Sequence, residues 1–137
     1  MQVRRAMLAQ RASMSDVGAV NLIGAGVAHL LPRTQPLPRH ETFTVVAQVD
    51  AAGDTEGAQY KMHVRLLGPS GSGIASQEAQ ITVPAPPTKS VPNRFLVFFA
   101  FAGLYVVDAG LYNVTVSAGA EDSTQRGNAV QFGFYIG

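Results

Sequence analysis

The sequence predicts an all-β fold: a single antiparallel β-sandwich of about eight strands, immunoglobulin-like or jelly-roll-like. Short apolar segments are separated throughout by turn-forming residues, because 14 Gly and 8 Pro are spread over 137 residues. Within several segments, apolar residues recur at every second position, which is typical of half-buried strands. The length is that of one domain, residues 1–137, and no helix is predicted.

The first third of the chain predicts two strands joined by a hairpin turn. Val3–Ala12 is interpreted as a strand, although a helical turn or two is an alternative, and "SDVG" at residues 15–18 supplies the turn. The second strand, Val20–Leu31, contains "GAG", and glycine inside a strand marks a bulge, a bend or a close backbone approach. The segment "PRTQPLPRH" then predicts an extended connection.

The middle and end of the chain contain the clearest alternation. In "QYKMHVRLL", the residues Tyr60, Met62, Val64 and Leu66 face one way, whereas Lys61, His63 and Arg65 face the other. The other segments with this pattern are "ETFTVVAQVD" (41–50), the weaker "IASQEAQITV" (74–83), "LYNVTVSAG" (111–119) and "AVQFGFYI" (129–136). We expect all of them to be strands that bury one face.

The segment "NRFLVFFAF" (93–101) is different because both of its faces are apolar. Phe95, Val97, Phe99 and Phe101 line one face, and Leu96, Phe98 and Ala100 line the other. A sandwich strand normally buries only one face, so the second needs a cover: a long loop, the N-terminal segment or another chain. The residues predicted to form an interface are Arg94, Phe95, Leu96 and Phe98, with Arg94 in its polar rim.

The stretch "DAGLYNVTV" (108–116) resembles the tyrosine corner of immunoglobulin-like sandwiches. In that motif the tyrosine ring fills the core and its hydroxyl bonds to the backbone before the turn, which predicts this role for Tyr112. Asp108 can tighten the turn, and Gly110 can adopt a positive φ. Val114 stands where antibody domains have a cysteine, which excludes a disulfide of that type. We interpret the stretch as a structural corner.

No catalytic or cofactor-binding pattern is visible in the sequence. His29, His40 and His63 lie in separate segments, and "GPSGSG" and "GAGV" lack the spacing of a nucleophile elbow, a phosphate loop or a dinucleotide site. Glu41, Glu78 and Asp108 are not placed together by any pattern. A Ca²⁺ site remains an alternative, with ligands from Asp50, Asp54 and Glu56 of the acidic loop and from residues 121–122. We expect a non-enzymatic protein without a cofactor.

Composition limits the partners further. The net charge is +1, which predicts attraction neither to nucleic acid nor to an anionic membrane. There is no cysteine, no recognisable signal peptide, and no apolar run near the about 20 residues of a membrane helix. Charged residues are only 14%, against about 25% in an average domain. The surface is therefore either that of a small polar β domain or that of a subunit covered by neighbours.

The segments "VNLIGAG", "ETFTVVAQVD" and "GLYNVTV" give the chain a resemblance to a family of small β-sandwich proteins of actinobacteria and their bacteriophages. The resemblance implies a sandwich fold and a phage-encoded origin. It implies no activity and no functional residues.

Together these observations predict a structural or assembly protein that acts through protein–protein interfaces. Its most concrete form is a bacteriophage virion component, either a capsid decoration or a tail-associated protein, present as a homo-oligomer or as a subunit of a larger particle. The expected location is the virion, or the cytoplasm if the chain is not phage-encoded. The alternative is a small ligand- or carbohydrate-binding sandwich module, which the lack of tryptophan and the four tyrosines speak against.

Overall fold

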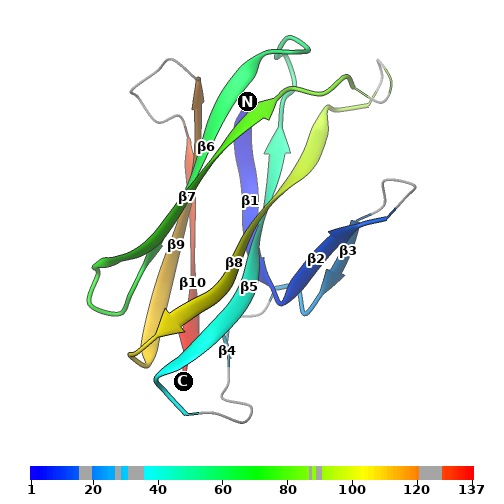
Figure 1. Ribbon diagram of the computed structural model, residues 1–137. Helices are drawn as coiled ribbons and strands as arrows, with labels where there is room; N and C mark the ends of the chain where they lie inside the picture. Colours follow the sequence, from blue (N-terminus) through cyan, green and yellow to red (C-terminus); the bar gives the residue numbers. More distant parts are fainter. Residues whose placement is uncertain (16–19, 27–28, 31–35, 87, 89–90, 121–127) are drawn as a thin grey trace.

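The fold is an all-β sandwich, which confirms the predicted fold class (Figure 1). The computed structural model describes residues 1–15, 20–26, 29–30, 36–86, 88, 91–120 and 128–137. Within these ranges the strands are β1 (Gln2–Ala9), β2 (Arg11–Met14), β3 (Val20–Ile23), β4 (His29–Leu30), β5 (Arg39–Asp50), β6 (Gln59–Leu67), β7 (Gly73–Thr82), β8 (Arg94–Val106), β9 (Gly110–Ala120) and β10 (Ala129–Ile136). No helix in these ranges is long and apolar enough to cross a membrane.

Two sheets pack face to face. The three-stranded sheet has the order β1-β5-β8, and the five-stranded sheet has the order β4-β10-β9-β6-β7. Neighbouring strands are antiparallel, except that the short β4 runs parallel to β10. A separate hairpin, β2–β3, stands out on the right of the sandwich in Figure 1. The structure therefore has a small third sheet that the alternation of residues did not predict.

The structure corrects the two strands predicted at the N-terminal end. The predicted strand Val3–Ala12 divides into β1 and β2, and the predicted strand Val20–Leu31 divides into β3 and β4. The hairpin between them is present, since β2 and β3 pair in antiparallel register, although its turn lies outside the described residues.

Glycine explains why the second of these strands is interrupted. Gly24 and Gly26 have φ values of +63° and +73°, which end β3. The chain then returns along the end of β1, where the Gly26 N–H donates to the Leu8 carbonyl at 2.8 Å. A Cβ on Gly24 would also lie 2.8 Å from Cγ of Gln10, so that side chain would have to move.

The core lies between the two sheets and follows the predicted alternation. The inward residues of β5 and β6 include Phe43, Val45, Met62 and Val64, and all of them are buried. Aromatic rings join the sheets: Phe43 lies 5.3 Å from Phe101 of β8 and 5.4 Å from Phe134 of β10. The Phe134 ring in turn stacks on Tyr112 of β9, 5.8 Å away. This continuous aromatic column fixes the spacing of the two sheets at one end of the sandwich.

Candidate protein interface

The outer face of the three-stranded sheet carries an apolar row that crosses all three strands. Met7 of β1 pairs with Val46 of β5, and Val46 pairs with Phe98 of β8. Leu96 lies two residues before Phe98 on the same face of β8. We call Met7, Val46, Leu96 and Phe98 the outer apolar face. Val46 is only 1% exposed and Thr44, on the same face of β5, is 8% exposed, so the middle of this face is already covered within the chain, where the β2–β3 hairpin contacts β5. Met7, Leu96 and Phe98 are half-buried.

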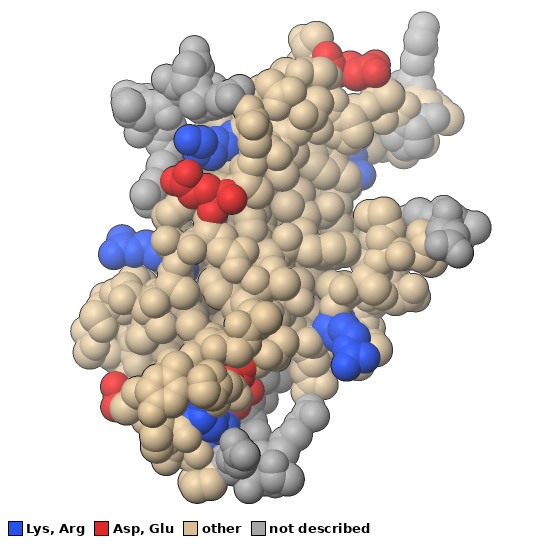
Figure 2. Space-filling model, in the orientation of Figure 1, with Lys and Arg blue, Asp and Glu red and all other residues tan. Residues whose placement is uncertain are grey.

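Exposed apolar side chains also occur on the hairpin and before β8. The hairpin β2–β3 contacts β5 and presents Met14, 62% exposed, and Ile23, 56% exposed. Val91, in the segment that leads into β8, is exposed as well. Figure 2 shows the hairpin projecting from the body on the right, with a notch above it, and shows charged residues that are few and scattered. Single exposed apolar residues are ordinary, whereas a contiguous apolar patch marks a contact surface.

The residues predicted to form an interface divide between the two faces of β8. Leu96 and Phe98 lie on the outer apolar face, as the alternation of residues predicts. Phe95 packs against the core from the inner side, so its ring is not available to a partner on the outer face. Arg94 lies at the start of β8, half-exposed, and its Nε is 3.2 Å from Oδ2 of Asp50.

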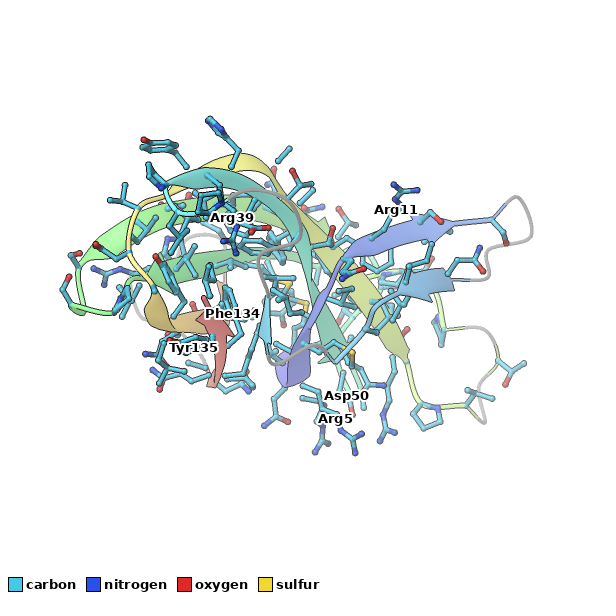
Figure 3. All side chains as sticks on the ribbon, turned by 90° about the horizontal axis from the view of Figure 1, so that it is seen from below. Arg5, Arg11, Arg39, Asp50, Phe134 and Tyr135 are labelled. Carbon is cyan, nitrogen blue, oxygen red and sulfur yellow. The ribbon has the colours of Figure 1, made fainter. Side chains whose placement is uncertain are left out.

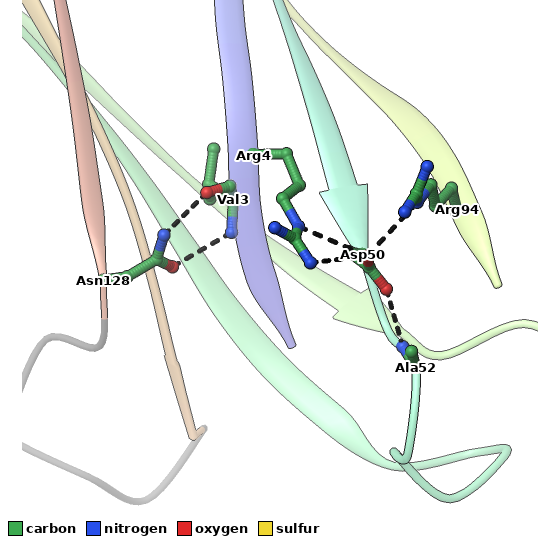
Figure 4. Close-up of polar contacts among 6 residues, drawn as sticks. All are labelled: Val3, Arg4, Asp50, Ala52, Arg94 and Asn128. Carbon is green, nitrogen blue, oxygen red and sulfur yellow. Dashed lines mark hydrogen bonds and ion pairs between the residues drawn. The ribbon is translucent and has the colours of Figure 1, made fainter. Parts of the chain in front are cut away.

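Asp50 at the end of β5 connects all three strands of that sheet (Figure 4). Its Oδ2 accepts from Arg94 of β8 and lies 3.2 Å from Nη2 of Arg4 on β1, while its Oδ1 accepts from the Ala52 N–H at 2.9 Å. The bond from Ala52, together with the two arginines, holds the pKa of the Asp50 carboxyl below its ordinary value, against the effect of burial. No spacing in the sequence indicated this cluster, because its members lie on separate strands.

The acidic loop is engaged by positively charged and hydroxyl groups of the chain itself. The carboxylate of Asp54 accepts from the Tyr60 hydroxyl at 2.5 Å and pairs with the amino group of Met1. Burial raises the pKa of Asp54, but these two bonds outweigh it and leave the pKa below its ordinary value. Glu56 is exposed, and residues 121–122 lie outside the described residues. Within the described part of the chain, no three His, Asp or Glu side chains are grouped to hold a metal ion.

The corner predicted at residues 108–112 has a defined hydrogen bond. Tyr112 is 1% exposed and its hydroxyl donates to the Asp108 carbonyl at 2.7 Å, so the hydroxyl returns to the backbone before the turn. Gly110 has a φ of +145°, and a Cβ there would lie 2.8 Å from Cγ of Pro69.

In Figure 3 the labelled neighbours Phe134 and Tyr135 of β10 point to opposite sides, Phe134 toward the core and Tyr135 outward.

The histidines remain apart from one another. The ring of His40 lies 5.2 Å from the ring of Tyr105, and the side chain of His29 is not among those described. His63 lies between Glu78 of β7 and Ser117 of β9 in the sheet register, a neighbourhood that the sequence did not reveal. The Glu78 carboxylate lies 3.8 Å from Nζ of Lys61.

The other two candidate carboxylates are also separated. Glu41 pairs with the buried Arg39 on the same strand, and Asp108 lies in the connection between β8 and β9. The three candidate carboxylates Glu41, Glu78 and Asp108 therefore lie on β5, on β7 and before β9, and the structure does not bring them into one site.

Comparison with known proteins identifies a family and a similar fold. The profile of a family of unknown function, DUF6941, matches residues 4–127. No curated protein matches the chain. Among solved structures, the chain is similar to part of a "putative beta-galactosidase from bacteroides fragilis", with a TM-score of 0.52 and 14% sequence identity. The similarity covers 73% of this chain and 14% of that one, so it shows the fold alone.

Proposed function

The chain belongs to the DUF6941 family, whose function is unknown, and from this premise we propose that the protein is a non-enzymatic assembly subunit. Its function is to bind a neighbouring protein subunit through the outer apolar face and the hairpin beside it. The observation that carries the proposal is the cross-strand row of Met7, Val46 and Phe98, together with the exposed Met14 and Ile23 on the hairpin that contacts β5.

The chemistry of this surface supports protein binding more than small-molecule binding. Protein interfaces have an apolar centre with few charges and a polar rim that contains arginine. Here the apolar residues lie over three strands and a hairpin, and Arg4 and Arg94 lie at the edge where Asp50 ends β5. The row itself consists of Met, Val and Phe, and the polar side chains beside it on the same face of β5 are Thr44 and Gln48.

The concrete form of the proposal is a virion component, either a capsid decoration or a tail-associated protein. Its basis is the resemblance to β-sandwich proteins of actinobacteria and their phages, together with a charge content of 14%. A subunit whose surface is largely covered by neighbours needs few charged groups for solubility. In this form, identical subunits contact one another as well as the particle.

Sedimentation velocity over a range of protein concentrations tests the proposal. We expect the wild type to self-associate and Met14→Asp to weaken association about tenfold or more, because a carboxylate in an apolar contact loses its water without gaining a partner. Met14 is largely exposed, so this substitution leaves the core intact. Phe98→Asp is a second variant with the same expected direction.

Leu111→Asp is the matched control. Leu111 is an exposed leucine on β9 in the five-stranded sheet, so the same kind of change is made away from the proposed surface. Association should be unaffected by it. A wild type that remains monomeric at high concentration, or a loss of association with Leu111→Asp alone, would contradict the proposal.

A further inference from the structure

The last strand of the five-stranded sheet, β7, has an open edge. It is the terminal strand in the order β4-β10-β9-β6-β7, so alternate N–H and C=O groups along it face away from β6. Natural proteins usually protect such an edge with proline, lysine, a bulge or an inward-pointing charge. The sequence GIASQEAQIT of β7 has no proline and no lysine, and its one charged residue is Glu78, which faces outward.

The other edge on this side of the sandwich, β8, is protected. The Ala100 carbonyl of β8 accepts a hydrogen bond from the Gln77 side chain at 2.6 Å. Near its end β8 has a bulge opposite Thr42, where Gly103 has a φ of +65° and its N–H donates to the Thr42 hydroxyl. The two edges therefore differ: β8 has an engaged carbonyl at Ala100 and a bulge near its end, whereas β7 keeps a regular register with β6 from Ala75 to Thr82.

We propose that β7 pairs in antiparallel fashion with β7 of a second copy of this chain, centred on Ala79, so that the two five-stranded sheets become one continuous sheet. A two-fold axis requires the same strand on both sides, and an antiparallel pair places each residue opposite one that points to the same face. Only registers centred on a single residue satisfy both conditions.

The side chains of β7 select among these registers. Centring on Glu78 places two glutamates directly opposite each other, which is unfavourable. Centring on Gln77 extends the pairing into the irregular start of β7, where the register with β6 shifts between Leu66 and Leu67. Centring on Ala79 uses the regular stretch from Ser76 to Thr82.

The register centred on Ala79 also gives compatible neighbours. It pairs Ser76 with Thr82, Gln77 with Ile81 and Glu78 with Gln80 of the second copy, and Ala79 with its own copy. Gln80 can donate to the Glu78 carboxylate, and the small Ala79 side chains meet on the axis without crowding. The arrangement uses a surface different from the outer apolar face, so it goes beyond the assembly role proposed above.

Disulfide cross-linking tests this arrangement directly, because the native chain has no cysteine. In the proposed dimer the two copies of Ala79 lie opposite each other, at a Cα separation of about 4.5–5.5 Å that a disulfide can span. The control is Ser76→Cys on the same strand, whose two copies would be six residues apart along the ladder, about 20 Å. We expect rapid oxidation of Ala79→Cys to a covalent dimer and slow oxidation of Ser76→Cys.

Charge variants at an exposed position give a second, independent measurement. Gln80→Glu places a carboxylate opposite Glu78 twice in each dimer and should weaken dimerisation about fivefold, whereas Gln80→Lys should not weaken it. The proposal would be overturned if Ala79→Cys and Ser76→Cys oxidised at equal rates, whether both are fast or both are slow. Met14→Asp should leave the Ala79→Cys cross-link unchanged, so failure at this edge and failure at the outer apolar face are distinguishable.

Discussion

Removal of the Tyr112 hydroxyl is the sharpest test of the corner that begins β9. In Tyr112→Phe the ring keeps its place beside Phe134, and only the hydrogen bond to the Asp108 carbonyl is lost. A neutral intramolecular hydrogen bond contributes about 0.5–1.5 kcal/mol net, and a buried acceptor left unpaired costs about 1–3 kcal/mol. This hydrogen bond is only partly buried, and we expect a loss of about 1–1.5 kcal/mol in the free energy of unfolding.

The assay is chemical denaturation, supported by thermal melting. For a domain of this size the loss corresponds to a decrease in melting temperature of roughly 3–6 °C. Tyr105→Phe removes the same group from an exposed tyrosine and should change stability by less than about 0.5 kcal/mol. An unchanged stability in Tyr112→Phe would refute the idea that this hydrogen bond holds the corner.

The same hydroxyl predicts a dependence on alkaline pH. Burial raises the pKa of Tyr112 above its ordinary value of 10.0 in the folded protein. The stabilisation is therefore complete below pH 10 and is lost as the pH rises through the higher folded-state pKa. The free energy of unfolding of Tyr112→Phe should therefore depend less on pH in this range than that of the wild type. Part of the dependence remains in the variant, because the bond to Asp54 raises the pKa of Tyr60 as well.

Two further predictions concern the backbone bend and the Asp50 cluster. Gly110→Ala should lower the free energy of unfolding by about 1–3 kcal/mol, because an L-residue is strained at a φ of +145° and its Cβ meets Pro69. The control Gly73→Ala meets only ordinary contacts and should be nearly neutral. Equal effects of the two substitutions in denaturation would contradict this reasoning. Asp50→Asn should lower the free energy of unfolding by about 1–2 kcal/mol at neutral pH. The loss is modest because the two arginines that pair with Asp50 are half exposed and their charges are screened by water. The pKa of Asp50 is lowered on folding, so its stabilisation is present above the ordinary value of 3.8 and is lost as the pH falls through the folded-state pKa. The difference between Asp50→Asn and the wild type should therefore shrink in acid, and a difference that is constant down to pH 2 would exclude the electrostatic origin.

The fold class was predictable because period-two alternation records which face of a strand is buried. The four inward residues of "ETFTVVAQVD" and three of the four of "QYKMHVRLL", Met62, Val64 and Leu66, lie in the core as their spacing predicts, whereas Tyr60 is half-buried and donates its hydroxyl to Asp54. The division of Val20–Leu31 was not predictable, because a glycine in a strand pattern can mark a bulge, a bend or a close contact. Here the two glycines adopt positive φ values and end the strand.

The candidate interface was predictable only in part. Two apolar faces on "RFLVFFAF" indicate that the second face needs a cover, and Leu96 and Phe98 do lie on the outer side. The contributions of Met7 and Val46 depend on strand order and register, which the sequence of one strand does not contain. The Asp50 cluster was missed for the same reason: its ion pairs join residues 46 and 44 positions apart.

The central claim is that the outer apolar face binds another protein subunit, and thiol accessibility measures this most directly. Ala100 is exposed on that face of β8, and Asn113 is exposed on β9 in the other sheet. Single-cysteine variants at the two positions would be reacted with a maleimide in dilute and in concentrated protein. We expect the thiol of Ala100→Cys to react at least about tenfold more slowly in the concentrated sample than in the dilute one, while the rate for Asn113→Cys stays the same. Equal rates for Ala100→Cys at all concentrations would contradict the claim.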